Sequence, residues 1–157
     1  MSKIAIFPGS FDPFTLGHKI IVDSGLRIFD KIYVGVGVNN SKPGLLNVDK
    51  RVELIRDVYK GNRSVEVMAY DGLTVDFAHS VNADHVLRGM RNSVDFEFER
   101  NMIHINQSLS PNLMAVLLFT PPEYVAISSS IVREVFAFGG DVSSFMPEGI
   151  KIENYLK

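Results

Sequence analysis

The chain has 157 residues, of which 46% are apolar and 22% charged; this composition fits one globular domain, so residues 1–157 are expected to form a single domain. Sixteen Lys and Arg against eighteen Asp and Glu give a formal charge of -2, which excludes a general basic field for nucleic acid or an anionic membrane. The absence of cysteine excludes disulfides and Cys-ligated metals, and no apolar run nears the roughly 20 residues that span a bilayer. We therefore expect a soluble, cytoplasmic protein.

Short apolar runs alternate along the chain with segments of helical spacing. The runs predict five strands, at residues 3–7, 32–38, 65–69, 85–88 and 114–119, and their continuous apolar character is typical of a parallel sheet. Helices are expected after His18, with Ile28 on the inner face, after Asn47 as N-cap, and over residues 73–81 and 94–109. This alternation predicts an α/β fold, an open five-stranded parallel sheet with helices on both faces.

The segment after the first predicted strand, residues 8–18, is the strongest candidate site, because ligands bind beyond the carboxyl ends of parallel strands. It is rich in Gly and Pro, and Ser10 adds a hydroxyl. His18 stands at a helix N-terminus, where free N–H groups and the helix dipole favour an anion. A tight loop with a capping histidine explains any one of these residues alone; their combination favours a phosphate site.

Basic residues follow two further strands. Lys42 comes after the second strand, where a solvated surface lysine is the common alternative. The fourth strand ends in Arg88-Gly89-Met90-Arg91, and guanidinium groups suit phosphate oxygens. The alternative is that both arginines pair with the acidic residues of the next helix, namely Asp95, Glu97 and Glu99.

The remaining motifs are a serine run, a glycine pair and scattered histidines. Ser128, Ser129 and Ser130 precede a helical pattern, and a helix cap explains only one of them, so the others are candidates for gripping phosphates. The Gly35-x-Gly37 pair has no third glycine at the required spacing, which excludes a dinucleotide fingerprint. His79, His85 and His104 lack metal-ligand spacing, so we expect surface or packing roles and no protein-bound metal.

Together, the Pro-Gly-Ser-Phe-Asp-Pro, Thr-x-Gly-His, Arg-Gly-Met-Arg, Asp-Phe-Glu-Phe-Glu and Ile-Ser-Ser-Ser segments resemble the nucleotidylyltransferase superfamily. More narrowly, residues 3 to about 147 resemble the bacterial phosphopantetheine adenylyltransferase family. The resemblance implies a Rossmann-like nucleotidylyltransferase fold and transfer of the adenylyl group of ATP to 4′-phosphopantetheine, giving dephospho-coenzyme A and pyrophosphate. Since the attacking phosphate is already ionised, such a reaction needs alignment and charge stabilisation rather than a general base.

The resemblance also implies roles for individual residues. The implied catalytic residues are His18, which would contact the α-phosphate, with Ser10, Lys42 and Arg88. The implied acceptor-binding residues are Ser10, Lys42, Thr74 and Arg88. The implied ATP-binding residues are Ser10, Phe11, His18, Gly89, Met90, Arg91, Glu99, Tyr124, Val125, Ala126, Ile127, Ser128, Ser129 and Ser130. Mg²⁺ would be carried by the ATP phosphates, coenzyme A would be a feedback ligand, and the assembly would be a homohexamer.

Three positions depart from the family pattern: Ser10 replaces a frequent threonine, Thr74 a common apolar residue, and Phe98 a frequent tyrosine. Residues 148–157 match the family only weakly. The Met and Phe positions around Phe96 to Met102 are more typical of a core or a subunit contact than of a cofactor site, and eleven Phe and six Met in the chain favour some contact with another subunit.

Other functions stay open. The acceptor of a related nucleotidylyltransferase would be nicotinate mononucleotide, or a sugar or polyol phosphate. A second class is a nucleotide-binding protein without turnover, which the intact basic residues disfavour. A third is an RNA-binding fragment similar to class I aminoacyl-tRNA synthetases, which the net charge disfavours.

Overall fold

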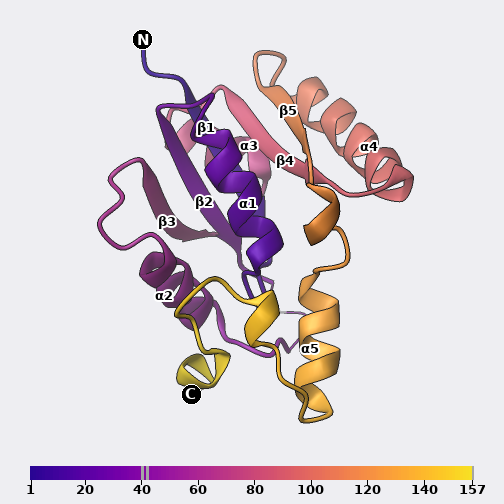
Figure 1. The fold of residues 1–157 in the computed structure, drawn as a ribbon. Helices are drawn as coiled ribbons and strands as arrows, with labels where there is room; N and C mark the ends of the chain where they lie inside the picture. The colour runs from indigo at the N-terminus through magenta and orange to yellow at the C-terminus, as the bar shows by residue number, and fades with distance from the viewer. Residues whose placement is uncertain (40, 42, 157) are drawn as a thin grey trace.

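The computed structural model describes the whole chain except Asn40, Lys42 and Lys157. Five parallel strands form one sheet in the order β3-β2-β1-β4-β5 (Figure 1). The strands are β1 (Ile4–Gly9), β2 (Lys31–Gly37), β3 (Val65–Tyr70), β4 (His85–Met90) and β5 (Met114–Phe119). All five predicted strands are therefore confirmed. β1 and β4 each run two residues beyond the expected end, and β2 ends one residue earlier.

Helices cover both faces of this sheet, as the alternating pattern predicts (Figure 1). α1 (Leu16–Gly25), α2 (Val48–Val58) and α5 (Ser129–Ala137) pack on the face of Ala5 and Phe7. α3 (Thr74–Ser80) packs on the opposite face with Ile6, and α4 (Ser93–Leu109) lies beside α3. Neighbouring residues of β1 thus enter opposite core layers, as successive strand residues must.

A local sequence signal sets the start of α2, whereas the end of α1 departs from the prediction. The Asn47 side chain accepts a hydrogen bond from the backbone N–H of Lys50, so Asn47 is the predicted N-cap of α2. The placement of Ile28 on the inner face of α1 is wrong. α1 ends at Gly25, and the following turn leaves Ile28 44% exposed while Phe29 enters the core. The chain must turn there because β2 begins at Lys31.

A tight contact joins β2 to α3. A Cβ atom at Gly35 would overlap the Phe77 ring, so only glycine lets the strand and the helix approach this closely. The Phe77 ring in turn stacks on Tyr70, with a centroid distance of 4.5 Å and an interplanar angle of 10°. Gly35, the first glycine of the Gly35-x-Gly37 pair, therefore serves packing inside β2.

Within the described residues, every helix is too short or too polar to cross a lipid bilayer.

Candidate active site

The sheet reverses its direction of growth between β1 and β4. β2 and β3 add on one side of β1, whereas β4 and β5 add on the other. β1 and β4 pair only through Ala5 with His85 and Ile6 with Val86, so the two strands separate toward their carboxyl ends. Such a switch point is where open α/β sheets bind ligands.

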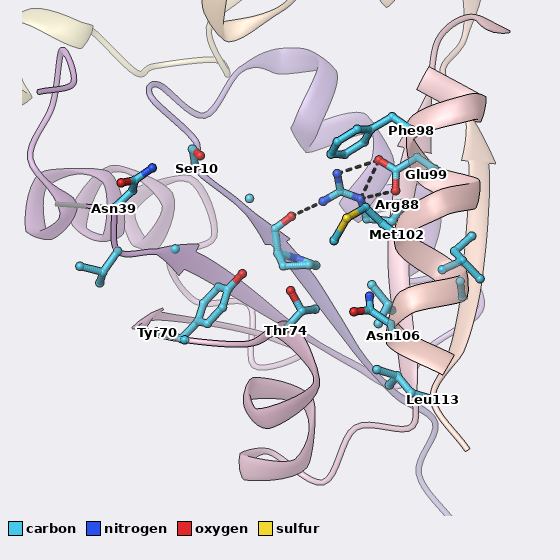
Figure 2. A pocket seen from close by; sticks show the side chains of 18 residues that line it. Ser10, Asn39, Tyr70, Thr74, Arg88, Phe98, Glu99, Met102, Asn106 and Leu113 are labelled. Carbon is cyan, nitrogen blue, oxygen red and sulfur yellow. Dashed lines mark hydrogen bonds and ion pairs between the residues drawn. The ribbon is translucent and has the colours of Figure 1, made fainter. Parts of the chain in front are cut away.

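Two adjoining pockets occupy this opening. The first, here called the His18 pocket, has a volume of about 370 Å³ and lies between the β1–α1 loop, the end of β4 and the start of α5. The second, the Tyr70 pocket, has a volume of about 310 Å³ and lies between the ends of β1–β3, α3 and α4 (Figure 2). The pockets share six lining residues: Pro8, Gly9, Ser10, Arg88, Phe98 and Glu99.

His18 is held at one ring nitrogen by Thr15, the N-cap of α1. The backbone N–H of Thr15 donates to Nδ1 of His18 at 3.0 Å, and the Thr15 hydroxyl oxygen lies 3.1 Å from the same atom. This is a capping box in which histidine takes the position usually held by Glu or Gln. Because Nδ1 accepts, the network assigns the ring proton to Nε2, which provides a hydrogen-bond donor for the pocket.

The surroundings of His18 keep its ring neutral. The ring packs against Phe11 and Phe14, with centroid distances of 5.1 and 5.4 Å. Burial, with the positive charges of Arg88 and Arg91 adding to it, lowers the pKa of His18 from 6.5 to about 3. At neutral pH the residue is therefore a neutral donor and not a cation.

Arg88 bridges the two strands that diverge. Its Nε atom donates to both carboxylate oxygens of Glu99 at 2.9 Å, and a terminal nitrogen donates to Glu99 Oε1 at 2.7 Å (Figure 2). The other terminal nitrogen donates to the backbone carbonyl of Pro8 on β1. Among the described residues these bonds use three of the five N–H groups of Arg88. Arg88 thus pairs with an acidic residue of α4, as the alternative interpretation predicted. Two of its N–H groups remain available to bind a ligand where the pockets meet.

Arg91 and Gly89 line the His18 pocket beside Arg88. Arg91 donates from Nε to Asp95 at 3.2 Å, so it too pairs with α4, in a more exposed setting. A Cβ atom at Gly89 would overlap the side chain of Ile21. The close approach that this glycine permits is therefore to α1.

The three serines before and at the start of α5 have different partners. Ser128 caps the helix by accepting from the backbone N–H of Ile131. Ser129 donates to the backbone carbonyl of Pro13 at 2.8 Å, and Ser130 accepts from Arg133. Capping thus accounts for one serine, as expected, and all three line the His18 pocket.

Comparison with known proteins places the chain in a family. Residues 6–135 match the family model described as cytidylyltransferase-like. A protein named phosphopantetheine adenylyltransferase from Bacteroides thetaiotaomicron is 46% identical over 94% of this chain and 97% of its own length. The chain belongs to the phosphopantetheine adenylyltransferase family. Relatives with the same name are 46% identical in Lactobacillus johnsonii, over 93% of this chain and 89% of theirs, and 43% identical in Clostridium botulinum, over 94% and 93%.

Solved structures share the fold of this phosphopantetheine adenylyltransferase family member at lower identity. A candidate nicotinate-nucleotide adenylyltransferase from Vibrio parahaemolyticus superposes with a TM-score of 0.72 at 22% identity, covering 99% of both chains. A bifunctional NMN adenylyltransferase/ADP ribose pyrophosphatase from Francisella tularensis gives 0.72 at 15% identity, covering 99% of this chain and 48% of its own. These likenesses show the nucleotidyltransferase-type fold.

The geometry gathers most of the residues that the family resemblance implies. The His18 pocket is lined by Ser10, Phe11, His18, Arg88, Gly89, Arg91, Glu99, Ile127, Ser128, Ser129 and Ser130, and the Tyr70 pocket by Thr74. The lining does not include Met90, Tyr124, Val125 or Ala126, which flank it in the chain. Lys42 lies outside the described residues.

Other lining residues were not predicted from the sequence. Tyr70 ends β3, where the sequence carries no charged motif, and Asn39 follows β2, where the only residue singled out from the sequence was Lys42. On α4, Phe98, Met102 and Asn106 line the Tyr70 pocket, whereas the sequence favoured core or subunit contact for the Phe and Met positions. The spacing of four residues, which places apolar Phe98 and Met102 on one helix face with polar Asn106, is the signal that distinguishes them.

Two of the histidines outside the pockets, His79 and His85, have local partners. His79 Nε2 lies 3.0 Å from the Ser110 hydroxyl, and His85 Nδ1 lies 2.6 Å from Asp84. Among the described residues no group of three or more His, Cys, Asp or Glu is arranged to hold a metal ion.

Proposed function

We propose that this chain transfers the adenylyl group of ATP to 4′-phosphopantetheine, forming dephospho-coenzyme A and releasing pyrophosphate. The observation that carries the proposal is the meeting of two pockets at Ser10 and Arg88. One pocket is polar and lies beside a neutral His18 donor and a helix N-terminus; the other is more apolar. Family membership supports the same reaction.

The His18 pocket suits MgATP, with Mg²⁺ entering on the triphosphate as part of the substrate. Arg91 and the N-terminus of α5, with its exposed N–H groups, favour phosphate oxygens. Lys42 would add a further positive charge at the phosphates, as the family resemblance implies. His18 Nε2–H would donate to an oxygen of the α-phosphate, where negative charge builds up in the transition state.

The transfer is an in-line displacement. An oxygen of the acceptor phosphate attacks the α-phosphorus, the bond from the α-phosphorus to the bridging oxygen breaks, and pyrophosphate leaves with the electron pair. The free N–H groups of Arg88, between the two pockets, would hold the two reacting phosphates against their mutual repulsion. No proton has to be removed from the acceptor, because its phosphate is already ionised.

The Tyr70 pocket suits the pantetheine arm, which is long and uncharged and carries amide groups. Its lining combines apolar Met102 and Leu113 with the uncharged polar groups of Tyr70, Thr74 and Asn106 (Figure 2). The charged side chains among the described lining residues are Arg88 and Glu99, which pair with each other. A nicotinate carboxylate would find no separate cation among them, so the charge pattern favours the pantetheine acceptor over nicotinate mononucleotide.

The test is pyrophosphate release from MgATP with 4′-phosphopantetheine, with nicotinate mononucleotide, or without an acceptor. We expect pyrophosphate release from MgATP only when 4′-phosphopantetheine is the acceptor. Release with nicotinate mononucleotide only would replace the proposal by its alternative. Absence of release with any acceptor, from a protein that binds ATP, would favour a nucleotide-binding role.

We also propose a cytoplasmic homohexamer with coenzyme A as feedback ligand. Large apolar side chains are exposed on α4 and on β5, an edge strand: Phe119 is 80% exposed, and Phe98, Ile105, Leu109 and Met114 are exposed as well. Burial of this surface in a closed symmetric assembly supports the proposal. Coenzyme A contains both an adenine nucleotide and a pantetheine arm, so it suits both pockets together.

A further inference from the structure

We propose that Asp12 and Arg51 are positioning residues that hold the Ser10–Phe11 backbone in the geometry required for transfer. This inference rests on the adenylyl transfer proposed above. Neither side chain lines the His18 pocket or the Tyr70 pocket, so both would act through the loop between β1 and α1.

Asp12 and Arg51 form a buried ion pair under the active site. Asp12 is 6% exposed and Arg51 is 8% exposed, and Nε of Arg51 lies 3.5 Å from Oδ1 of Asp12. The Asp12 carboxylate also accepts hydrogen bonds from the backbone N–H groups of Leu45 and Leu46, each at 2.8 Å. One carboxylate from the β1–α1 loop therefore binds the segment that leads into α2.

Arg51 closes the same network from α2. Its Nε atom donates to the carbonyl of Leu46 at 2.8 Å, and a terminal nitrogen donates to the carbonyl of Ser10 at 3.2 Å. A Cβ atom at Gly44 would overlap both the guanidinium of Arg51 and the carboxylate of Asp12, so the chain passes directly over the pair. Arg51 thus joins the backbone of Ser10, a proposed catalytic residue, to the segment that leads into α2.

The opposite side of the β1–α1 loop is tied to α5. Arg133 donates to the backbone carbonyl of Asp12 at 2.7 Å, and Ser129 donates to that of Pro13 at 2.8 Å. The loop is therefore clamped between α2 on one side and α5 on the other.

This clamp supports a conformation that the loop would not adopt alone. Phe11 has a φ of 51°, in the left-handed region that a bulky residue rarely occupies, and its ring packs edge-on against His18. Loss of the Arg51 bond to Ser10 frees the neighbouring backbone. If the backbone of Phe11 relaxes, its ring moves, and the His18 imidazole that packs against this ring moves with it.

Arg51→Lys tests the inference, because lysine keeps the charge but cannot bond Leu46 and Ser10 with the geometry of a guanidinium. Arg56→Lys is the matched control. Arg56 lies on the same helix and also donates to a backbone carbonyl, that of Val67 on the edge strand β3, at 3.0 and 3.3 Å, but it lines neither active-site pocket. Arg51→Met with Arg56→Met extends the comparison to full loss of the charge.

The first readout is kcat and KM for both substrates, at a temperature below the unfolding midpoint of every variant. Misplacement of reacting groups by about 1 Å can lower the rate on the order of 10²-fold. We expect Arg51→Lys to lower kcat at least ~10-fold with smaller changes in KM, and Arg56→Lys to leave kcat unchanged. Equal kcat values in the two variants would overturn the positioning role.

The second readout does not depend on catalysis. The imidazole NMR signal of His18, assigned with His18→Asn, should shift in Arg51→Lys and keep its position in Arg56→Lys. An unchanged signal in both variants contradicts the inference, even if the wild-type protein uses another acceptor. Absence of pyrophosphate release from the wild-type protein, with the His18 shift present, would instead count against the proposed function alone.

Discussion

Thr15 donates its backbone N–H to Nδ1 of His18, three residues further along the first turn of α1. One bond thus fixes the ring orientation, the tautomer and the start of the helix. The His18 side chain completes the capping box of Thr15 and is also the proposed catalytic donor, so a substitution of His18 is expected to change both the stability and the rate.

Replacement of His18 by Asn is expected to lower kcat by ~10²–10³-fold, the usual effect of losing one donor directed at developing charge. ATP affinity should change little, since Arg91 and α5 provide the other proposed phosphate contacts. Steady-state kinetics together with ATP calorimetry provide the measurement. His85→Asn, at the opposite end of β4, is the control. A wild-type kcat in His18→Asn would remove His18 from the proposed mechanism.

The pH dependence of kcat/KM for 4′-phosphopantetheine should reflect the ionisation of the substrate phosphate and not that of His18. The second ionisation of a phosphate monoester has a pKa of about 6, whereas the pKa of His18 is about 3 in the free protein. The rate constant should therefore fall as the pH drops below about 6, and the same fall should persist in His18→Asn. Disappearance of the fall in that variant would assign it to His18.

Folding stability should depend on the pH through His18. Its folded pKa is depressed below the unfolded value of 6.5, so the unfolded chain binds the proton more readily. Stability is therefore full above the unfolded pKa and is lost as the pH falls toward 3. Between pH 7.5 and 5 this site should remove about 2 kcal/mol, measured by urea unfolding. His18→Asn should show a smaller loss over that interval; an identical loss in both proteins would argue against the depressed pKa.

Arg88 and Arg91 should differ in which substrate they affect. Arg88 lines both pockets, so Arg88→Ala should raise the KM values for ATP and the acceptor and also lower kcat. Arg91 lines the His18 pocket alone, so Arg91→Ala should act mainly on the KM for ATP. Initial-rate measurements with each substrate varied in turn compare the two variants. Identical patterns for both would contradict the separate roles of the pockets.

Tyr70→Phe tests the acceptor pocket without changing its shape. Loss of one hydrogen bond to a neutral group is worth about 0.5–1.5 kcal/mol, so the KM for 4′-phosphopantetheine should rise roughly 2- to 12-fold. The KM for ATP should stay the same, because Tyr70 does not line the His18 pocket. Tyr33→Phe, at a tyrosine that lines neither pocket, serves as the control. An increase in the KM for ATP alone would show that the pockets are assigned in the wrong order.

Patterns local in sequence could be predicted well. Each strand is predicted from a short apolar run. Asn47 is predicted as a cap, and one of the three serines 128–130 is expected to be another, because a cap depends on the next three residues. The end of α1 was not found, because it depends on where β2 must begin, and Phe29 replaces Ile28 in the core for that reason. Long-range geometry therefore decides such boundaries.

The site shows the same division. Phosphate-type motifs such as Arg88-Gly89-Met90-Arg91 stand out because they are charged and follow a strand. The Asp12–Arg51 pair does not stand out, because its bonds join distant parts of the sequence. Asp12 binds backbone groups 33 and 34 residues away, and Arg51 binds the Ser10 carbonyl 41 residues away. Tyr70 and Asn106 are ordinary polar residues in the sequence, and only the folded chain brings them to one cavity.

The stack of Gly35, Phe77 and Tyr70 has a consequence for inhibitors. Tyr70 forms part of the wall that a pocket-filling compound would touch, whereas Phe77 and Gly35 lie behind it and line neither pocket. Any side chain larger than hydrogen at Gly35 displaces the Phe77 ring, and the displaced ring moves Tyr70 with it. Resistance to such a compound would therefore arise at a residue that the compound never contacts, and a survey limited to the contact residues would overlook it.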